Sequence, residues 1–344
     1  MKQFQDKQFN IDNYQGGSVQ NPVDDRDYKF GELMAIGAVT GVSDKEWDDG
    51  YDSEEYVGVK LTHENQDGSL SCVAQTVQKV GEGLNFIETG ELLDFSAKRI
   101  YEEIALPGGG AYTAVGAKFA CDNGFMAEKD SPSYENGQPP SEAYMTKKLA
   151  YSKEKLNNEK KFKSNRYYYA YTIDEMATAI KNQKFIIMSA NGENSGWQNG
   201  DLKPPQSIAW GHAFMGKSFK RRLNPNNGII QKAIKIHNSW GNLWGYGGDG
   251  WIYEDYFKAG HVHSGIALVD QANLKTMGIN IKLVKTANAP TVYLIGLGDG
   301  LYHPVFNAKI ALDLFGKTWA EMNIEAIDKI PADKIGYLFG GIIS

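Results

Sequence analysis

Cysteine is scarce in this chain, since only Cys72 and Cys121 occur among its 344 residues. Two cysteines cannot build the framework of several disulfides that staples many secreted domains. We therefore expect a hydrophobic core to supply the stability, and a reducing compartment or a particle assembled in one. The expected location is cytoplasmic or within a virion or similar assembly, although a disulfide-free protein can also be exported.

Long apolar runs and an excess of basic residues are missing as well. No run approaches the ~18 apolar residues of a membrane span, and the polar segment Met1–Asp6 lacks the apolar core of a signal peptide. The formal net charge of -6 argues against a general nucleic-acid binder, which needs a basic face. With 42% hydrophobic and 23% charged residues, the composition indicates an ordinary soluble globular protein.

Two polar stretches near the N-terminus lack clear periodicity. Residues 1–29 are rich in Gln, Asn, Asp and Gly, and we expect them to form an extended arm. Residues 44–55 are acidic, and their spacing does not match a calcium-binding loop. A solvated turn is the expected structure of this second stretch.

Helical patterns dominate the first half of the chain beyond the arm. Apolar residues recur at helical spacing in Cys72–Val80, and Ser71 stands where a hydroxyl can cap the helix start. Gly108-Gly109-Gly110 separates two further expected helices. A capping box at Thr172–Glu175 opens another helix, which reaches about Asn182. The two helices flanking the glycines are expected at residues 96–101 and 111–123.

Strand patterns dominate the second half. The expected strands are residues 168–171, 185–188, 212–219, 228–236 and 250–253. A helix-rich half followed by a strand-rich half predicts an α+β protein with a cleft between the halves. We place this domain at residues 30–275.

The pattern changes again near residue 270. Residues 291–295 and 302–306 flank a glycine-rich stretch and predict a hairpin, and residues 308–322 predict an amphipathic helix. Residues 290–344 are therefore expected to form a small appended α/β module. The glycine-rich stretch, Gly296–Gly300, lacks the following Lys-Ser/Thr of a phosphate loop.

Three short motifs contain the groups needed for acyl transfer to a thiol. Cys72 lies at a helix start, where the helix dipole favours the nucleophilic thiolate, and His212 can supply the base. Asn238 can hold the second imidazole nitrogen, and Trp240 can shield that hydrogen bond from water. Gln66 and the backbone N–H of Cys72 can stabilise the oxyanion.

These motifs resemble those of the papain-like cysteine peptidases over about residues 30–270. Residues 66–72, Gln-Asp-Gly-Ser-Leu-Ser-Cys, are similar to the family's Gln-Gly-x-x-Gly-Ser-Cys segment. Residues 211–216 resemble its base-bearing strand, and residues 238–241 match its Asn-Ser-Trp-Gly segment. The resemblance implies a two-lobed fold, with a helical lobe and a β-barrel-like lobe. It also implies a thiol endopeptidase that acts on peptides or proteins through an acyl-enzyme, without cofactor or metal.

The resemblance further implies that Gly109 and Gly110 line the cleft and pair with the substrate backbone near P2. Trp240 and Leu70 complete the expected substrate-binding set. This sequence departs from the family at Asp67 and Leu70, which replace glycines, and at Val73, which replaces an aromatic residue. We expect Leu70 to crowd the S1 side of the cleft.

The arm is too short for the usual helical propeptide of this family. Hypothetically, an autoinhibited chain would place residues 1–28 across the cleft as an extended strand. Two other functions stay open. One is a structural or binding component of a virion or surface layer, with latent or lost activity and a partner for the C-terminal module. The other is transglutaminase-like acyl transfer, which Asn238 disfavours because those enzymes usually carry Asp.

The other histidines and the second cysteine are expected to be structural. His63 precedes the Gln66 loop, and His237 should point to the strand face opposite Asn238. His261 and His263 form a pair without an evident third ligand, so no metal site is predicted. Cys121 is expected to be an inert core thiol.

Overall fold

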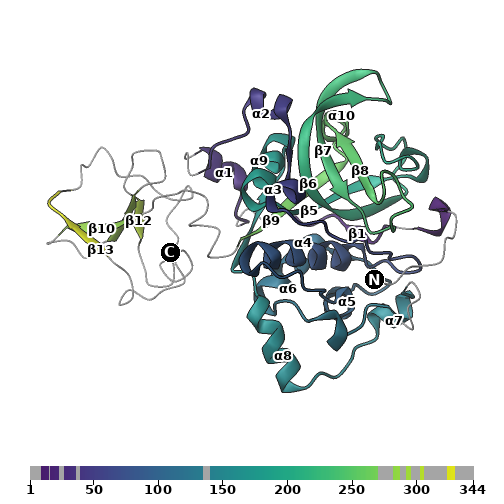
Figure 1. The fold of residues 1–344 in the computed structure, drawn as a ribbon, viewed down its shortest axis with the longest axis horizontal. Helices are drawn as coiled ribbons and strands as arrows, with labels where there is room; N and C mark the ends of the chain where they lie inside the picture. The colour runs from purple at the N-terminus through teal and green to yellow at the C-terminus, as the bar shows by residue number, and fades with distance from the viewer. Residues whose placement is uncertain are drawn as a thin grey trace. The chain divides into compact units, whose positions relative to one another are not determined.

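Two compact units make up this protein. The computed structural model describes residues 9–14, 16–22, 27–35, 39–134 and 140–269, together with 282–286, 292–295, 303–305 and 324–329. One unit contains residues 1–28 and 42–269, and the other contains residues 29–41 and 270–344. Figure 1 shows both as ribbons, and each is described by itself.

Helices form one lobe of the larger unit. The long helix α4 is buried along most of its length and packs against α5 and α6. Two of its glycines permit close packing, because a Cβ atom on Gly81 or Gly83 would lie within 2.5 Å of the ring of Phe125 or Phe185. The helices of this lobe are α4 (Cys72–Thr89), α5 (Ala97–Ile104), α6 (Thr113–Asp122), α7 (Glu142–Thr146) and α8 (Lys153–Glu159).

An antiparallel seven-stranded sheet forms the other lobe (Figure 1). Its strand order is β4-β9-β5-β6-β7-β8, and β2 pairs with β6. The long strand β6 runs through the middle and packs on α4. The strands are β2 (Tyr51–Asp52), β4 (Arg166–Ala170), β5 (Ile186–Gly192), β6 (Trp210–Asn224), β7 (Ile229–His237), β8 (Asp249–Tyr253) and β9 (Val262–Val269). The α+β prediction, with helices before strands, is confirmed.

Local capping explains where several helices begin. The capping box at Thr172 is present and opens α9 (Ile173–Gln183), as predicted. The acidic stretch is not a solvated turn, because Ser43 and Glu46 form a second capping box. This stretch instead forms α2 (Asp44–Asp49) and α3 (Ser53–Val57), and the buried side chain of Trp47 anchors α2.

Ser71 does not cap α4 as predicted. It occupies the N-cap position, but its side chain makes no capping hydrogen bond. The hydroxyls of Ser71 and Ser69 lie 2.7 Å apart and share a hydrogen bond, and the amide of Gln75 donates to Ser71. The first turn of α4 therefore presents its backbone N–H groups without a competing side chain.

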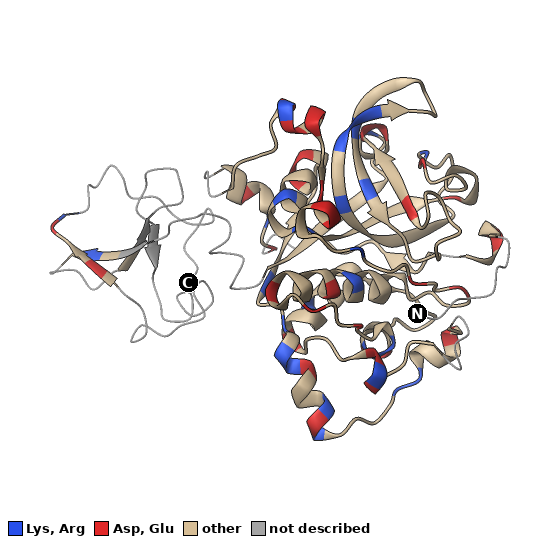
Figure 2. Ribbon diagram, viewed as in Figure 1, with Lys and Arg blue, Asp and Glu red and all other residues tan. Residues whose placement is uncertain are grey.

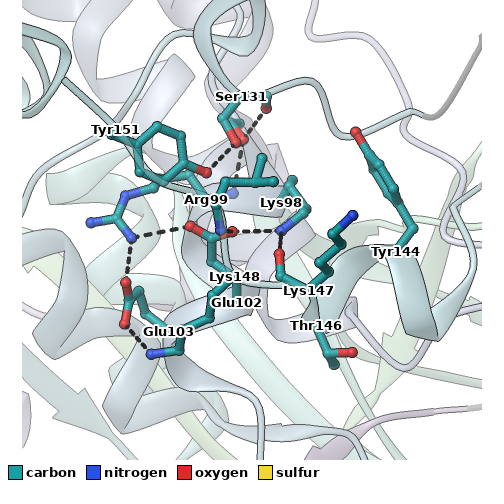
Figure 3. Close-up of polar contacts among 12 residues, drawn as sticks. Lys98, Arg99, Glu102, Glu103, Ser131, Tyr144, Thr146, Lys147, Lys148 and Tyr151 are labelled. Atoms are coloured by element: carbon teal, nitrogen blue, oxygen red, sulfur yellow. Dashed lines mark hydrogen bonds and ion pairs between the residues drawn. The ribbon is translucent and has the colours of Figure 1, made fainter.

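Buried ion pairs stabilise the helical lobe (Figure 3). The ammonium of Lys98 is fully buried and lies 2.5 Å from the carboxylate of Glu102, one turn along α5. Arg99 pairs with Glu159 of α8 at 2.9 Å and with Glu103 at 2.7 Å. These contacts join α5 to α8. No disulfide joins Cys72 to Cys121, and Cys121 is only half-buried rather than part of the core.

Charged residues of both signs are interspersed along α8 and around β6 (Figure 2). Among the described residues, no helix is long and apolar enough to cross a membrane. Three further short elements of the larger unit are η1 (Ile11–Asn13), β1 (Ser18–Val19) and α10 (Glu254–Lys258). β1 pairs in parallel with β3 (Ala111–Tyr112).

The smaller unit contains a four-stranded sheet in the order β12-β11-β10-β13. β11 and β12 pair antiparallel, as the predicted hairpin requires, whereas β10 and β13 form a parallel pair that was not predicted. The glycine-rich stretch 296–300 and the predicted helix 308–322 lie outside the described residues. The elements are α1 (Phe30–Ala35), β10 (Lys282–Thr286), β11 (Val292–Ile295), β12 (His303–Val305) and β13 (Ile324–Ile327).

Candidate active site

Cys72 is the first residue of α4, and its side chain is fully buried. Burial raises the pKa of this thiol to about 11, although hydrogen bonds from the backbone of Ala213, Gly17 and Val73 act in the opposite direction. The bond from Ala213 places strand β6 directly against the sulfur. In this state the thiol is protonated at neutral pH.

His212 lies in β6, one residue before Ala213, and contacts Asn238 beyond the end of β7. Its Nε2 atom is 2.7 Å from Oδ1 of Asn238. Burial lowers the pKa of His212 to about 4, outweighing this hydrogen bond. Asn238 thereby fixes Nε2, which leaves Nδ1 as the nitrogen able to accept the thiol proton.

Aromatic rings surround the imidazole. Trp240 is buried, and its ring centroid lies 4.7 Å from that of His212. Trp197 and Trp210, which sequence reasoning missed, lie at 5.6 Å and 6.0 Å from the same ring. Trp210 lies two residues before His212 in the same strand. Alternate residues of a strand share a face, so this spacing was the signal that could have placed Trp210 beside His212. This wall keeps water away from the His212–Asn238 hydrogen bond.

The Gln66 loop is attached to the Asn-Ser-Trp-Gly segment. The backbone N–H of Gln66 donates to the carbonyl of Ser239 at 2.9 Å, and the Ser239 hydroxyl donates to Oε1 of Gln66 at 2.5 Å. Nε2 of Gln66 donates to the carbonyl of Ser69 at 3.2 Å. The structure therefore brings three of the sequence motifs together in one place, with Gln66 oriented by Ser239.

Comparisons with known proteins address the fold. No protein-family model matches the chain, and no curated protein sequence does. Among solved structures, xylellain, a cysteine protease from Xylella fastidiosa, matches with a TM-score of 0.59 at 17% identity, covering 75% of this chain and 97% of that one. Procathepsin L2 from the Tenebrio molitor larval midgut matches with a TM-score of 0.56 at 16% identity, covering 75% and 79%. This chain has the papain-like fold.

Within this papain-like fold, Gly109 and Gly110 adopt left-handed conformations, with φ values of 94° and 77°. A Cβ atom on Gly109 would lie 2.6 Å from Cδ1 of Leu70, so the Leu70 side chain lies against this loop. A Cβ atom on Gly110 would lie 2.4 Å from the carbonyl oxygen of Gly17. Both glycines therefore let other chain segments approach the loop closely.

Glu142 links this glycine loop to the loop that precedes Cys72, and sequence reasoning missed it. Its carboxylate accepts hydrogen bonds from the N–H of Leu70 and from the hydroxyl of Tyr101, both at 2.7 Å. Tyr101 in turn accepts a hydrogen bond from the N–H of Gly110 at 2.7 Å. The backbone N–H of Glu142 also donates to the carbonyl of Gly68.

The N-terminal arm lies across the papain-like site. The N–H of Gly17 donates to Sγ of Cys72 at 3.3 Å, and the carbonyl of Gly17 accepts from the N–H of Ala111 at 2.7 Å. The ring of Tyr14 lies 5.4 Å from that of Trp240. A Cβ atom on Gly17 would lie 1.9 Å from the carbonyl oxygen of Leu70, so only glycine fits there. Of the described arm residues, Ser18–Val19 form a strand and Ile11–Asn13 a 3-10 helix, so the arm is extended only in part.

Two other histidines, His63 and His237, form a cluster with Asp249. His237 stacks on His63 with ring centroids 3.7 Å apart, and His63 lies 3.5 Å from Asp249. The ammonium of Lys217 already occupies this cluster, 2.9 Å from Asp249, and its positive charge opposes a metal cation. A second cluster of acidic side chains among the described residues likewise contains a buried cation, Lys79. His261 and His263 belong to neither cluster.

Proposed function

We propose that this protein is a cysteine peptidase that hydrolyses peptide bonds through an acyl-enzyme. The 2.7 Å contact between His212 and Asn238, beside a thiol at the start of α4, carries this proposal. Cys72 is the nucleophile, His212 the general base and then acid, and Asn238 the orienting group. The papain-like fold supports protein or peptide substrates.

The reaction follows from these positions. Nδ1 of His212 takes the thiol proton, and the thiolate attacks the carbonyl carbon of the substrate. The N–H of Cys72 and the side-chain amide of Gln66 stabilise the oxyanion. His212 then gives its proton to the leaving amine as the C–N bond breaks. Water, deprotonated by His212, hydrolyses the thioester and restores the thiol.

The arm makes the described state a latent one. A substrate whose P2 residue pairs with Gly110 runs from Gly110 toward Cys72. The arm runs in the opposite chain direction. Its Gly17 contacts the sulfur of Cys72, and the next residues, in β1, lie beside Ala111. Because its backbone polarity is reversed, the arm presents no peptide bond in the orientation for attack. It also excludes water, which keeps the Cys72 thiol and the His212 imidazole both neutral.

Labelling by an epoxysuccinyl probe and peptide turnover test this function. The intact chain, a chain lacking residues 1–28 and a Cys72→Ala variant of each are compared. We expect labelling and turnover to rise when the arm is removed, and both to vanish with Cys72→Ala. Hydrolysis retained by Cys72→Ala would refute the assignment of the nucleophile.

A structural role in a larger assembly is the second candidate. The arm seated on Cys72 and the separate four-stranded sheet of the smaller unit favour it. In that case residues 30–275 would be a repurposed peptidase domain, and residues 290–344 would bind an assembly partner. If Cys72 stays unreactive after the arm is removed, the result would favour this structural role over the peptidase function.

A further inference from the structure

The side chain of Asn21, beyond the arm's β1 strand, is held at both ends of its carboxamide. Oδ1 accepts a hydrogen bond from the N–H of Ala114 at 3.0 Å. Nδ2 donates to Oγ1 of Thr113 at 2.8 Å and lies 3.5 Å from Oγ of Ser264. These partners come from the start of α6 and from β9, so a single side chain of the arm bridges both lobes of the larger unit.

The residues around this carboxamide, here called the Asn21 pocket, are largely buried. Thr113 and Ser264 are 1% and 4% exposed. Ser189 pairs with Ser264 across β5 and β9, so both side chains lie on one face of the sheet. The Ser189 hydroxyl is buried and has no hydrogen-bond partner. The pocket therefore offers one backbone N–H and a row of neutral hydroxyls, so the groups of Thr113, Ala114 and Ser264 that bond Asn21 are all uncharged.

This chemistry matches a carboxamide better than an apolar or an ionised side chain. An apolar side chain would leave the Ala114 N–H and the buried hydroxyls without these hydrogen bonds. A carboxylate would lose its hydration without gaining a cation. We propose that this pocket is a carboxamide subsite, filled by Asn21 when the arm covers Cys72 and by an Asn or Gln side chain of the substrate when the arm is displaced. The substrate half of this proposal rests on the proposed peptidase function.

Alkylation of Cys72 in the full chain tests the arm's half of the proposal. Iodoacetamide labelling is followed peptide by peptide by mass spectrometry, with the half-buried Cys121 as an internal reference. Asn21→Leu keeps the shape but loses the hydrogen bonds, so we expect Cys72 to react about tenfold faster. Asn21→Asp and Thr113→Val should also accelerate it. Asn13→Leu, an exposed site on the same arm, should match the native rate. An Asn21→Leu rate equal to the native rate would overturn the proposal.

Cleavage of a position-scanning peptide library tests the substrate's half. The full chain is used with Gly17→Val, whose side chain cannot fit against Leu70. We expect a preference for Asn or Gln over Leu at one substrate position, about tenfold in kcat/KM, and its loss with an added Thr113→Val. Cleavage without such a preference would overturn the substrate half. Failure to cleave any peptide would contradict the proposed function. The Cys72 alkylation rates of the native chain and Asn21→Leu would still show whether Asn21 holds the arm in this pocket.

Discussion

The backbone N–H of Gly17 donates a hydrogen bond to the sulfur of Cys72 at 3.3 Å. The arm thus supplies this thiol with a backbone hydrogen bond, and the N–H of Ala111 donates to the carbonyl of the same glycine. The position tolerates no side chain, because a Cβ atom there would lie 1.9 Å from the carbonyl oxygen of Leu70. Closure of the arm therefore depends on a glycine at this one residue.

Replacing Gly17 with valine should open the site. The added side chain collides with backbone rather than with a flexible group, so the arm must leave its path. We expect the rate of epoxysuccinyl labelling of Cys72 to rise at least about tenfold. A tenfold rise corresponds to a loss of about 1.4 kcal/mol in the free energy that favours the closed arm over the open one. Gln20→Val, at an exposed arm position, serves as the control. Equal labelling of the two variants would refute closure by Gly17.

Arm closure should weaken in acid. Burial lowers the pKa of His212 to about 4 from an ordinary 6.5, so the closed state resists protonation. As pH falls from about 6.5 toward 4, the open state binds the proton that the closed state excludes, and the equilibrium shifts toward opening. Burial raises the pKa of Cys72 from 9.0 to about 11, so closure weakens above pH 9 as well. Closure is strongest between these limits.

Limited proteolysis of the arm checks this pH dependence. Because opening in acid takes up one proton, the opening equilibrium should change by up to about tenfold per pH unit. Samples are exposed to an acid-tolerant protease at each pH, and the intact arm is quantified. His212→Gln should lower the slope by about one proton. An unchanged slope would show that His212 is not the group that links arm closure to pH.

Asn238 should matter for turnover rather than for substrate binding. Asn238→Ala removes Oδ1, the acceptor 2.7 Å from Nε2 of His212, and leaves that nitrogen buried. Loss of one such bond costs about 1–3 kcal/mol, so we expect kcat to fall about 10–100-fold with little change in KM. Asn238→Asp keeps an acceptor and should raise the pKa of His212, which shifts the acid limb of the rate profile. A shift in KM alone would contradict this role.

The motifs that meet in the candidate site could be predicted because each is short and local. Gln66 to Cys72 is a single loop and helix start, and Asn238 follows a strand of clear apolar pattern. The strand-rich half was predicted for the same reason. By contrast, the acidic stretch 44–55 was misassigned because its charges concealed the capping box at Ser43 and the buried Trp47.

Residues whose roles depend on tertiary contacts could not be predicted. Glu142 lies 72 residues from Leu70 in sequence, and no local pattern relates the two. The hydroxyl of Ser71 bonds Ser69 instead of capping α4, because the folded loop brings the two serine side chains together. In the sequence Asn21 resembles the other polar residues of the arm. Its partner Thr113 lies 92 residues away, so no local pattern indicates their hydrogen bond.

Glu142 should act as a positioning residue. Its carboxylate holds the N–H of Leu70 and, through Tyr101, the glycine loop expected to bind the substrate backbone. Glu142→Ala should raise KM more than it lowers kcat, with a loss of about tenfold in kcat/KM. Glu142→Gln retains an acceptor oxygen and should recover part of this loss. Glu154→Ala, at an exposed site on α8, should leave both constants unchanged. Equal losses in the Ala and Gln variants would contradict hydrogen-bonded positioning.

The buried pair of Lys98 and Glu102 should be costly to break from one side. Glu102→Ala leaves a fully buried ammonium with its charge uncompensated, and we expect unfolding free energy to fall by about 3–5 kcal/mol in urea titrations. Replacing both residues, Lys98→Met with Glu102→Leu, should recover most of this loss because the Lys98 ammonium is then no longer buried without its partner. The exposed pair Lys118–Asp122 has the same spacing, and Asp122→Ala should cost under about 1 kcal/mol. A double variant as unstable as Glu102→Ala would show instead that the loss arises from packing or from the hydrogen bond of Leu149 to Glu102.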